Sequence, residues 1–150
     1  MILYHGVDVI EVARVRQAVI RYGRRFLDRV YTAAEQTDCG LTTDVVRYEA
    51  LAARWAAKEA CAKALGIGLR GLGALAVTDR PRAGLREIEV VRDPVGRPQL
   101  RLAGVAEQTA SALGIQAMAV SLSHTNELAL ASVVAWGAPK VEECPDTQSG

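Results

Sequence analysis

The chain has 150 residues, 50% of them hydrophobic and 23% charged, a composition typical of a globular domain large enough to bury a core. Its 18 basic and 17 acidic residues leave a net charge of +1, a balance that argues against a protein dedicated to binding nucleic acid. No stretch reaches the roughly 18 apolar residues of a membrane span, so we expect no membrane insertion.

The first half of the chain predicts one strand followed by helices. Residues 2–10 are rich in Ile, Leu and Val and predict the strand. Apolar residues recur at helical spacing over 11–22, and Gly23 is a suitable C-cap. The sequence TAAE at 32–35 fits a capping box that opens a short helix. A loop with the sequence CGLTTD then leads into a long helix, which we expect over 44–65.

The second half of the chain predicts two hairpins with a helix between them. After a glycine-rich connection over 66–85, the runs REIEVVRD and RPQLRL predict strands around the turn DPVG. Residues 104–113 predict a helix, and AMAVSLSH and ELALASVVAW predict the second hairpin. These elements predict an α+β fold, a single domain over 1–136 whose mostly antiparallel sheet packs against the long helix. We expect the polar residues 137–150 to form a disordered tail.

The cysteines and the N-terminal residues indicate the cellular compartment in which the protein is expected. Cys39, Cys61 and Cys144 are odd in number and lack C-x-x-C spacing, which argues against a disulfide framework or a zinc knuckle. The opening residues, MILYHGVDVI, lack the basic region and the long apolar run of a signal peptide. We therefore expect a cytoplasmic protein.

The stretch RWAAKEACAKALGIG, over 54–68, places four charges in an otherwise apolar helix. Its alanines share one side of the helix and would let another element pack closely. Glu59 and Lys63 lie one turn apart, and one interpretation is an exposed ion pair that contributes roughly a few tenths of a kcal/mol. A mainly apolar helix is mostly buried, however, and a carboxylate in it then needs a cation, a metal or hydrogen bonds.

Asp8 is a second carboxylate, near the end of the first strand. Two carboxylates together with phosphate oxygens and water make a typical Mg²⁺ site. Lys63, one turn beyond Glu59, could then reach the same phosphate. Sequence spacing alone does not bring Asp8 to Glu59, because that step depends on the fold.

Five blocks of sequence together resemble the holo-(acyl-carrier-protein) synthase family, whose members are 4′-phosphopantetheinyl transferases. The blocks occur in the family's order and extend from Gly6 to Ala131: GVDVIEVARV, RFLDRVYTAAE, LAARWAAKEACAKALGIG, IEVVRDPVGRPQLRL and SLSHTNELALA. The resemblance implies that Asp8 and Glu59 hold Mg²⁺ against the pyrophosphate of coenzyme A, with Lys63 beside the phosphates. It also implies an α+β homotrimer whose catalytic residues, Asp8, Glu59 and Lys63, lie at subunit interfaces.

Two further stretches are candidates for coenzyme contacts. GIGLRG at 66–71 matches G-x-G-x-x-G but follows a predicted helix, which argues against a dinucleotide site. The resemblance favours contacts from Gly66 and Gly68 to coenzyme A, and a plain C-cap and loop is the alternative. The resemblance also places Ser123 and His124 near the coenzyme, whereas a purely structural histidine is the alternative there. No serine–histidine–acid set supports Ser123 as a covalent nucleophile.

Six arginines crowd the first predicted helix and its exit. Such a run is usually a solvated face, but carrier proteins are acidic and a basic patch could attract one. Arg14 and Arg21 are seven residues apart and share a helix face, and the resemblance makes Arg14 the strongest candidate for a carrier contact.

The leading hypothesis from the sequence is an Mg²⁺-dependent transferase. It would move 4′-phosphopantetheine from coenzyme A to a serine of an apo acyl carrier protein and release adenosine 3′,5′-bisphosphate. Whether the carrier serves fatty acid, polyketide or peptide synthesis stays open. One alternative is a non-catalytic subunit that binds coenzyme A or a carrier protein. Another is an RNA-binding module, against which the balanced charge and the low aromatic content of 5% argue.

Overall fold

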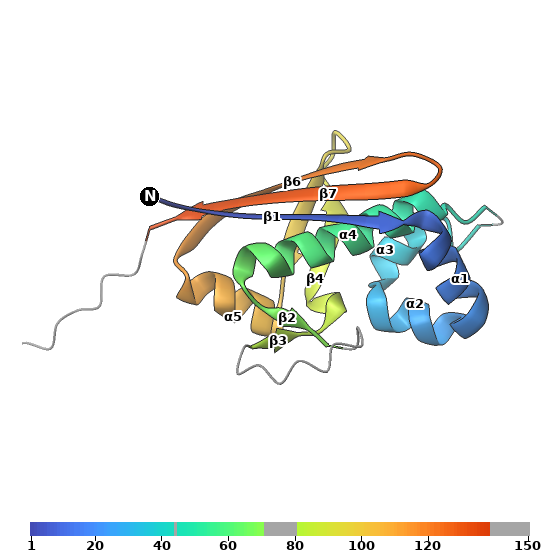
Figure 1. Cartoon of the computed structure of the whole chain (residues 1–150), viewed down its shortest axis with the longest axis horizontal. Coiled ribbons are helices and arrows are strands. Elements are labelled where there is room, and N and C mark those ends of the chain that lie inside the picture. Colours follow the sequence, from blue (N-terminus) through green and yellow to red (C-terminus); the bar gives the residue numbers. More distant parts are fainter. Residues whose placement is uncertain (44, 71–80, 139–150) are drawn as a thin grey trace, which may run out of the picture.

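A three-stranded antiparallel sheet lies across a long central helix (Figure 1). The computed structural model describes residues 1–43, 45–70 and 81–138. In the sheet, β7 (Leu128–Gly137) lies between β1 (Ile2–Glu11) and β6 (Ile115–His124), so β1 and β6 form the two edges. Helix α4 (Tyr48–Leu65) packs against the inner face of all three strands.

Small residues at the contact let the sheet approach α4 closely. A methyl group on Gly6 of β1 would overlap the backbone carbonyl of Ala60, so only glycine fits there. On the facing side of β7, Ala129, Ala131 and Ala135 are fully buried. The predicted close packing along the alanines of the long helix is therefore present.

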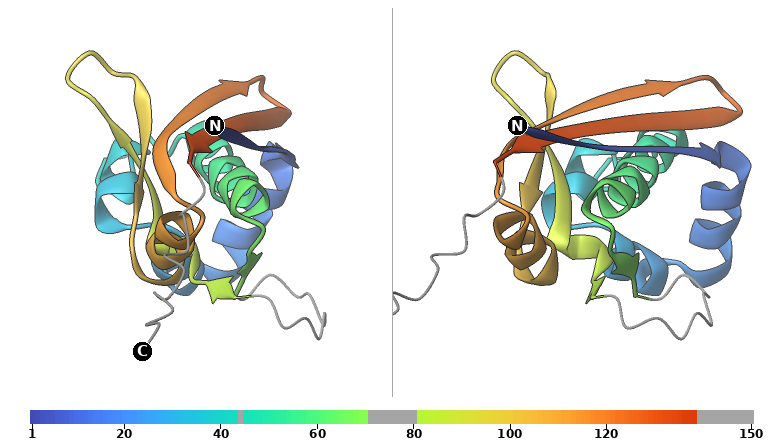
Figure 2. Two further views of the ribbon diagram at one scale, coloured as in Figure 1. Left: turned by 90° about the vertical axis from the view of Figure 1, so that its left-hand side faces the viewer. Right: turned by 60° about the vertical axis from the view of Figure 1, so that its left-hand side comes forward.

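Three short helices cover one end of α4 (Figure 2). They are α1 (Val12–Tyr22), α2 (Arg24–Val30) and α3 (Ala33–Asp38). Gly23 separates α1 from α2 with a positive φ of 53°, a backbone conformation that favours glycine. Helix α3 begins with the predicted capping box, in which Thr32 and Glu35 each bond the other's backbone N–H.

Strand β4 (Ile88–Arg92), which forms a hairpin with β5 (Pro98–Leu102), and helix α5 (Gly104–Ala112) also contact α4. Two short strands, β2 (Gly68–Leu69) and β3 (Arg82–Ala83), pair in parallel, and a 3₁₀ helix (Leu85–Glu87) precedes β4.

The predicted α+β fold, with its sheet against the long helix, is confirmed. The long helix begins at Tyr48, later than expected, and Asp44 lies outside the described residues. Helix α2 was not predicted. The connection expected over 66–85 contains β2 and β3, while its residues 71–80 lie outside the described part of the chain.

The boundary expected between domain and tail falls at the end of β7. Gly137, expected as the first residue of the tail, is the last residue of β7 and pairs with Ile2. Residues 139–150 lie outside the described residues, so the disordered tail stays a prediction. None of the helices described is both long enough and apolar enough to cross a membrane.

Candidate active site

The structure brings the two predicted carboxylates to one pocket. Asp8 lies on the helix-facing side of β1, and Glu59 projects from the middle of α4. Both line a pocket of about 330 Å³, here called the carboxylate pocket. The residues that line it are Asp8, Val9, Ile10, Arg14, Trp55, Glu59 and Leu69. The juxtaposition that sequence spacing alone did not supply is therefore made by the packing of β1 on α4.

Lys63 pairs with Asp8 and not with Glu59. Its Nζ donates to Asp8 Oδ1 at 2.8 Å and to the Val7 carbonyl at 3.0 Å. The surface ion pair between Glu59 and Lys63, one of the two interpretations of this helix, is absent among the ion pairs of the described residues. The ammonium lies instead at the margin of the carboxylate pocket, beside the carboxylate of β1.

Glu59 sits in a less polar environment than an ordinary surface glutamate. Trp55 Nε1 donates a hydrogen bond to Glu59 Oε1 at 3.4 Å. Burial of the side chain raises the pKa of Glu59 above its usual value. The hydrogen bond from Trp55 lowers this pKa, and the nearby Asp8 carboxylate raises it. A carboxylate with a raised pKa is a better proton acceptor at neutral pH than a fully solvated one.

The donor set of the carboxylate pocket fits a hard cation that brings its own ligands. Within residues 1–43, 45–70 and 81–138, no three His, Cys, Asp or Glu side chains gather closely enough to hold a metal by themselves. Asp8 and Glu59 supply two carboxylates. Mg²⁺ typically binds through one or two carboxylates plus substrate phosphates and water, so this pair fits Mg²⁺ only together with a phosphate ligand.

An apolar groove adjoins the carboxylate pocket and shares Trp55 with it. The groove has a volume of about 440 Å³ and is lined by Ala18, Tyr22, Arg25, Phe26, Arg29, Val30, Trp55 and Leu85. Arg14 lies over the Trp55 ring at 5.9 Å from its centre, and Arg21 lies over Tyr22 at 5.2 Å. Both predicted carrier contacts are therefore near the groove. Arg25 and Arg29 line it directly, and the sequence had marked them only as members of the arginine run.

A third hollow, of about 220 Å³, carries cationic side chains. It lies between α4, the β4–β5 hairpin and the end of β6, and its lining includes Arg54, Arg92 and His124; here it is called the cationic pocket. The Arg54 side chain is only 2% exposed. Its guanidinium donates to Asp38 Oδ2 at 3.3 Å, while its Nε is buried without a partner. An unsatisfied buried donor beside other cations is suited to an anionic ligand.

The residues predicted to contact coenzyme A do not all lie in one pocket. His124 lines the cationic pocket, whereas Ser123 is the exposed neighbour that points to the other face of β6. Gly66 is the C-cap of α4 with a φ of 69°, and its N–H bonds the Lys63 carbonyl. The N–H of Gly68 bonds Pro81. The N–H groups of these two glycines thus serve the helix cap and the β2–β3 ladder, as in the plain C-cap alternative.

The sequence analysis missed the burial of two cations of α4. Arg54 and Lys58 are almost wholly buried, although lysine and arginine are rarely so. The signal available in the sequence was their position four residues apart in a helix that is apolar nearly all round.

Comparison with known proteins agrees with this geometry. The model of the 4′-phosphopantetheinyl transferase superfamily matches residues 5–131. A holo-[acyl-carrier-protein] synthase of Chloroflexus aurantiacus is 77% identical over 134 residues, which cover 89% of this chain and 98% of that protein. One of Herpetosiphon aurantiacus is 50% identical over 90% of this chain and 99% of its own.

A solved structure described as an ACPS–CoA complex of Chronobacterium ammoniagenes has the same fold. It superimposes with a TM-score of 0.71 at 30% identity and covers 92% of this chain and 99% of its own. The match to the superfamily model takes in every residue that lines the carboxylate pocket, from Asp8 to Leu69. The chain therefore belongs to the 4′-phosphopantetheinyl transferase superfamily.

Proposed function

We propose that this protein is a holo-(acyl-carrier-protein) synthase. It transfers 4′-phosphopantetheine from coenzyme A to a serine hydroxyl of an apo acyl carrier protein and releases adenosine 3′,5′-bisphosphate. The observation that carries the proposal is the convergence of Asp8 and Glu59 on one pocket beside an apolar groove with an arginine rim. The relatives that bear this name, at 77% and 50% identity, support it.

In the proposed reaction the serine oxygen forms a bond to the β-phosphorus of coenzyme A. The bond from that phosphorus to the bridging oxygen of the pyrophosphate breaks, and the bridging oxygen leaves with the adenosine phosphate. Asp8 and Glu59 hold Mg²⁺, which when bound neutralises the pyrophosphate and polarises the attacked phosphorus. Glu59 would accept the serine proton as the general base. Lys63, now bonded to Asp8 at 2.8 Å, supplies positive charge to the leaving phosphate.

The apolar groove is the proposed docking place of the carrier protein. Phe26 and Trp55 give it an aromatic floor, with ring centres 5.3 Å apart, and Arg25 and Arg29 lie along it. An amphipathic helix with acidic flanks would bury its apolar face in such a groove and pair its carboxylates with the arginines. Arg14 lies where the groove meets the carboxylate pocket, so it would contact the carrier next to the reacting serine.

The cationic pocket is the proposed site for a phosphate of the adenosine part of coenzyme A. Arg54, with its unpartnered Nε, and His124 would both donate to that phosphate. The cationic pocket lies at the β6 edge of the sheet and the carboxylate pocket lies at the β1 edge. Because the two pockets lie at opposite edges, we propose that one coenzyme molecule bridges the carboxylate pocket of one chain and the cationic pocket of another.

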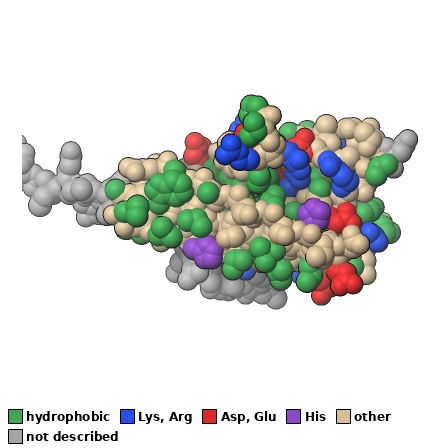
Figure 3. Space-filling model, turned by 90° about the horizontal axis from the view of Figure 1, so that it is seen from above, with side chains coloured by type: hydrophobic (Ala, Val, Ile, Leu, Met, Phe, Trp, Pro, Cys, Tyr) green, Lys and Arg blue, Asp and Glu red, His purple; other side chains and the backbone are tan. Residues whose placement is uncertain are grey.

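A ring of three chains resolves this separation. If the β1 edge of one chain faces the β6 edge of the next, each cleft combines the carboxylate pocket of one subunit with the cationic pocket of its neighbour. The outer face of the sheet supports such an assembly, because hydrophobic side chains gather on it (Figure 3). They are the exposed residues Leu3, Val7, Val9, Leu128, Leu130 and Trp136. We therefore propose a homotrimer with interfacial active sites.

We place the reaction in the cytoplasm, with a carrier protein of fatty acid synthesis as the first client to test. Purified apo carrier protein, coenzyme A and Mg²⁺ are incubated with this protein, and the carrier is weighed by mass spectrometry. The expected result is a gain of one phosphopantetheine group, abolished by excess EDTA and restored by added Mg²⁺. A non-catalytic binding subunit would bind coenzyme A or the carrier and leave the carrier mass unchanged.

A further inference from the structure

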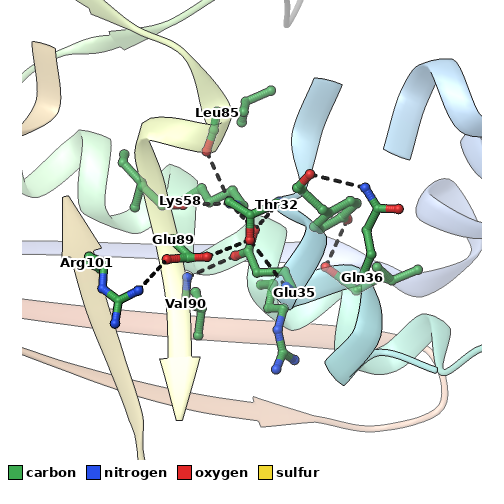
Figure 4. A network of polar contacts seen from close by, with 12 residues as sticks. Thr32, Glu35, Gln36, Lys58, Leu85, Glu89, Val90 and Arg101 are labelled. Atoms are coloured by element: carbon green, nitrogen blue, oxygen red, sulfur yellow. Dashed lines mark hydrogen bonds and ion pairs between the residues drawn. The ribbon is translucent and has the colours of Figure 1, made fainter. Parts of the chain in front are cut away.

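Lys58 makes a buried ion pair next to Glu59 in the sequence. Its side chain is 0% exposed, and its ammonium donates three hydrogen bonds (Figure 4). The acceptors are Glu35 Oε2 at 2.8 Å, the Ile88 carbonyl at 2.6 Å and the Leu85 carbonyl at 3.1 Å. One side chain of α4 is thereby tied to α3, to the 3₁₀ helix and to β4.

The carboxylate of Glu35 is fully bonded as well. Its Oε2 also accepts from the backbone N–H of Thr32 at 2.9 Å, and its Oε1 accepts from the backbone N–H of Val90 at 2.9 Å. The network reaches the surface through the Thr32 hydroxyl, which donates to Glu89, and Glu89 pairs with the exposed Arg101. Every charge in the buried part of this network has a partner.

Stability alone is a poor explanation for such a pair. Removing two charges from water is costly, and well-packed uncharged residues of similar volume are often as stable or more so. A buried polar contact can, however, fix one register where apolar packing would permit several. Helix α4 presents mostly alanines to the sheet, and Gly6 faces it from β1. Small side chains of this kind fix how closely the helix approaches the sheet, but they oppose rotation of the helix less than large interlocking side chains would.

We propose that Lys58 and Glu35 are positioning residues that fix the rotation of α4 so that Glu59 faces Asp8. Glu59 is the next residue of the helix, and its side chain ends about 5–6 Å from the helix axis. A rotation of roughly 20° would therefore move its carboxylate by about 2 Å, the full length of an Mg²⁺–oxygen bond. Displacements of about 1 Å can cost 100-fold in rate. The proposal rests on the proposed function, because it assigns the pair to the same carboxylate pocket.

The test replaces the pair by a neutral one of similar shape. In Glu35→Gln/Lys58→Met, the glutamine oxygen can still accept a buried N–H, its amide can donate to one of the two carbonyls, and methionine keeps the length of the lysine stem. Arg101→Met is the matched control, since it removes only the exposed cation at the far end of the same network. Melting temperature, Mn²⁺ affinity in the presence of coenzyme A, the number of Mn²⁺ sites and turnover are measured for the parent and both variants.

The proposal expects the double variant to melt within a few degrees of the parent, with a full number of Mn²⁺ sites. Its Kd for Mn²⁺ should be at least fivefold higher and its turnover at least tenfold lower, while Arg101→Met behaves like the parent. A parental Kd and turnover in the double variant would overturn the proposal. A reduced number of Mn²⁺ sites with unchanged affinity would also overturn it, because a purely structural role of the pair predicts that result.

Two further results keep the outcomes separate. If the double variant does not fold, the single variant Glu35→Gln is the test, because it keeps Lys58 bonded to both carbonyls but weakens the ion pair. Its Kd for Mn²⁺ should rise at least twofold. An unchanged Kd would overturn the proposal. If the parent protein itself does not modify the carrier, the proposed function is wrong, and this inference, which depends on it, is wrong as well.

Discussion

At the scale of single residues, Glu59 illustrates how its surroundings determine what a carboxylate can do. It lies on an apolar helix, accepts one hydrogen bond from Trp55 and shares its pocket with Asp8, and its burial raises its pKa. Lys63, one turn further along the helix, bonds Asp8 instead. Glu59 therefore has free capacity to bind a cation or to accept a proton, whereas a glutamate in a surface ion pair would have little.

Replacing Glu59 by glutamine should separate its chemical role from its structural one. The amide keeps the size of the side chain but removes the charge and the proton acceptor, so carrier modification should fall by about 100-fold or more. The melting temperature should stay within a few degrees, because a neutral amide no longer needs a cation. The exposed Glu107→Gln on α5 is the control. Turnover within a few-fold of the parent, with Mg²⁺ still required, would show that Glu59 has no catalytic role.

The buried thiols give a second prediction at this scale. Cys39 and Cys61 are both 0% exposed, and burial raises their pKa values to about 11 and about 12. The thiolate is the reactive form, so neither should react readily with a disulfide reagent at pH 8 in the folded protein. In a Cys144→Ser variant, absorbance at the reagent's wavelength should report no fast-reacting thiol before denaturation and two after it. Rapid reaction of either thiol in the native protein would contradict the burial.

Much of the candidate site could be identified from the sequence, and the part that could not be has a physical reason. Asp8 and Glu59 share one pocket, as expected from the resemblance, because each lies on an element whose face the sequence specifies. Arg14, expected only as a carrier contact, lines the same pocket. The partners of Lys58 and Arg54 could not be derived, since Glu35 and Asp38 belong to another helix and nothing local selects them. Pairing between residues distant in the sequence is a property of the packed structure.

At the scale of elements, the packing of β1 on α4 is the contact that makes the carboxylate pocket. It depends on Gly6, two residues before Asp8, where the strand backbone meets the helix backbone at Ala60. The sheet and the helix cannot separate locally without moving Asp8 away from Glu59. The glycine of the G-V-D sequence is therefore required by packing, whatever the chemical role of the aspartate.

Gly6→Ala should consequently destabilise the whole domain. The added methyl group overlaps backbone that cannot rotate away, so we expect a loss of about 3 kcal/mol or more in the free energy of unfolding, measured by urea denaturation. Gly23→Ala is the comparison, because that position has open space and only a strained backbone, with φ 53° and ψ −136°, which costs about 1–3 kcal/mol. An equal or smaller effect at Gly6 would mean that β1 shifts easily along α4.

The elements themselves were largely predictable, because hydrophobic period, glycine positions and the capping box are local signals. The capping box at Thr32 and the C-cap at Gly66 are examples that the structure contains. Helix α2 was missed, since it has only seven residues, too few for a clear period. The start of α4 at Tyr48 was also missed, because Arg47 precedes it without a side-chain cap.

At the scale of the whole molecule, the exposed apolar face of the sheet is the feature that a monomer does not explain. Leu130, on the central strand β7, is 39% exposed, and Val7 on the neighbouring β1 is 46% exposed. In the proposed homotrimer these residues face neighbouring subunits. Burial of such a patch is the main driving force available for assembly.

Leu130→Lys should therefore shift the protein from trimer to monomer. The new ammonium would be buried at the subunit contact without a partner, which is strongly unfavourable. Light scattering should show the mass of one chain at micromolar concentration, and carrier modification should be lost together with assembly. Val95→Lys, at an apolar and more exposed position in the β4–β5 turn, should remain trimeric. A parent that is monomeric and active would refute the homotrimer.

The separation of the two pockets to opposite edges of the sheet has a consequence for mixtures of subunits. A chain with Glu59→Gln keeps its cationic pocket, and a chain with His124→Ala keeps its carboxylate pocket. Each variant alone forms only defective clefts, but unfolding and refolding the two together should create clefts in which both contributions are intact. Random assembly of an equal mixture makes about a quarter of the clefts complete, so activity should recover to roughly that fraction of the parent. Recovery by complementation would mean that the catalytic unit of this protein is the boundary between two chains.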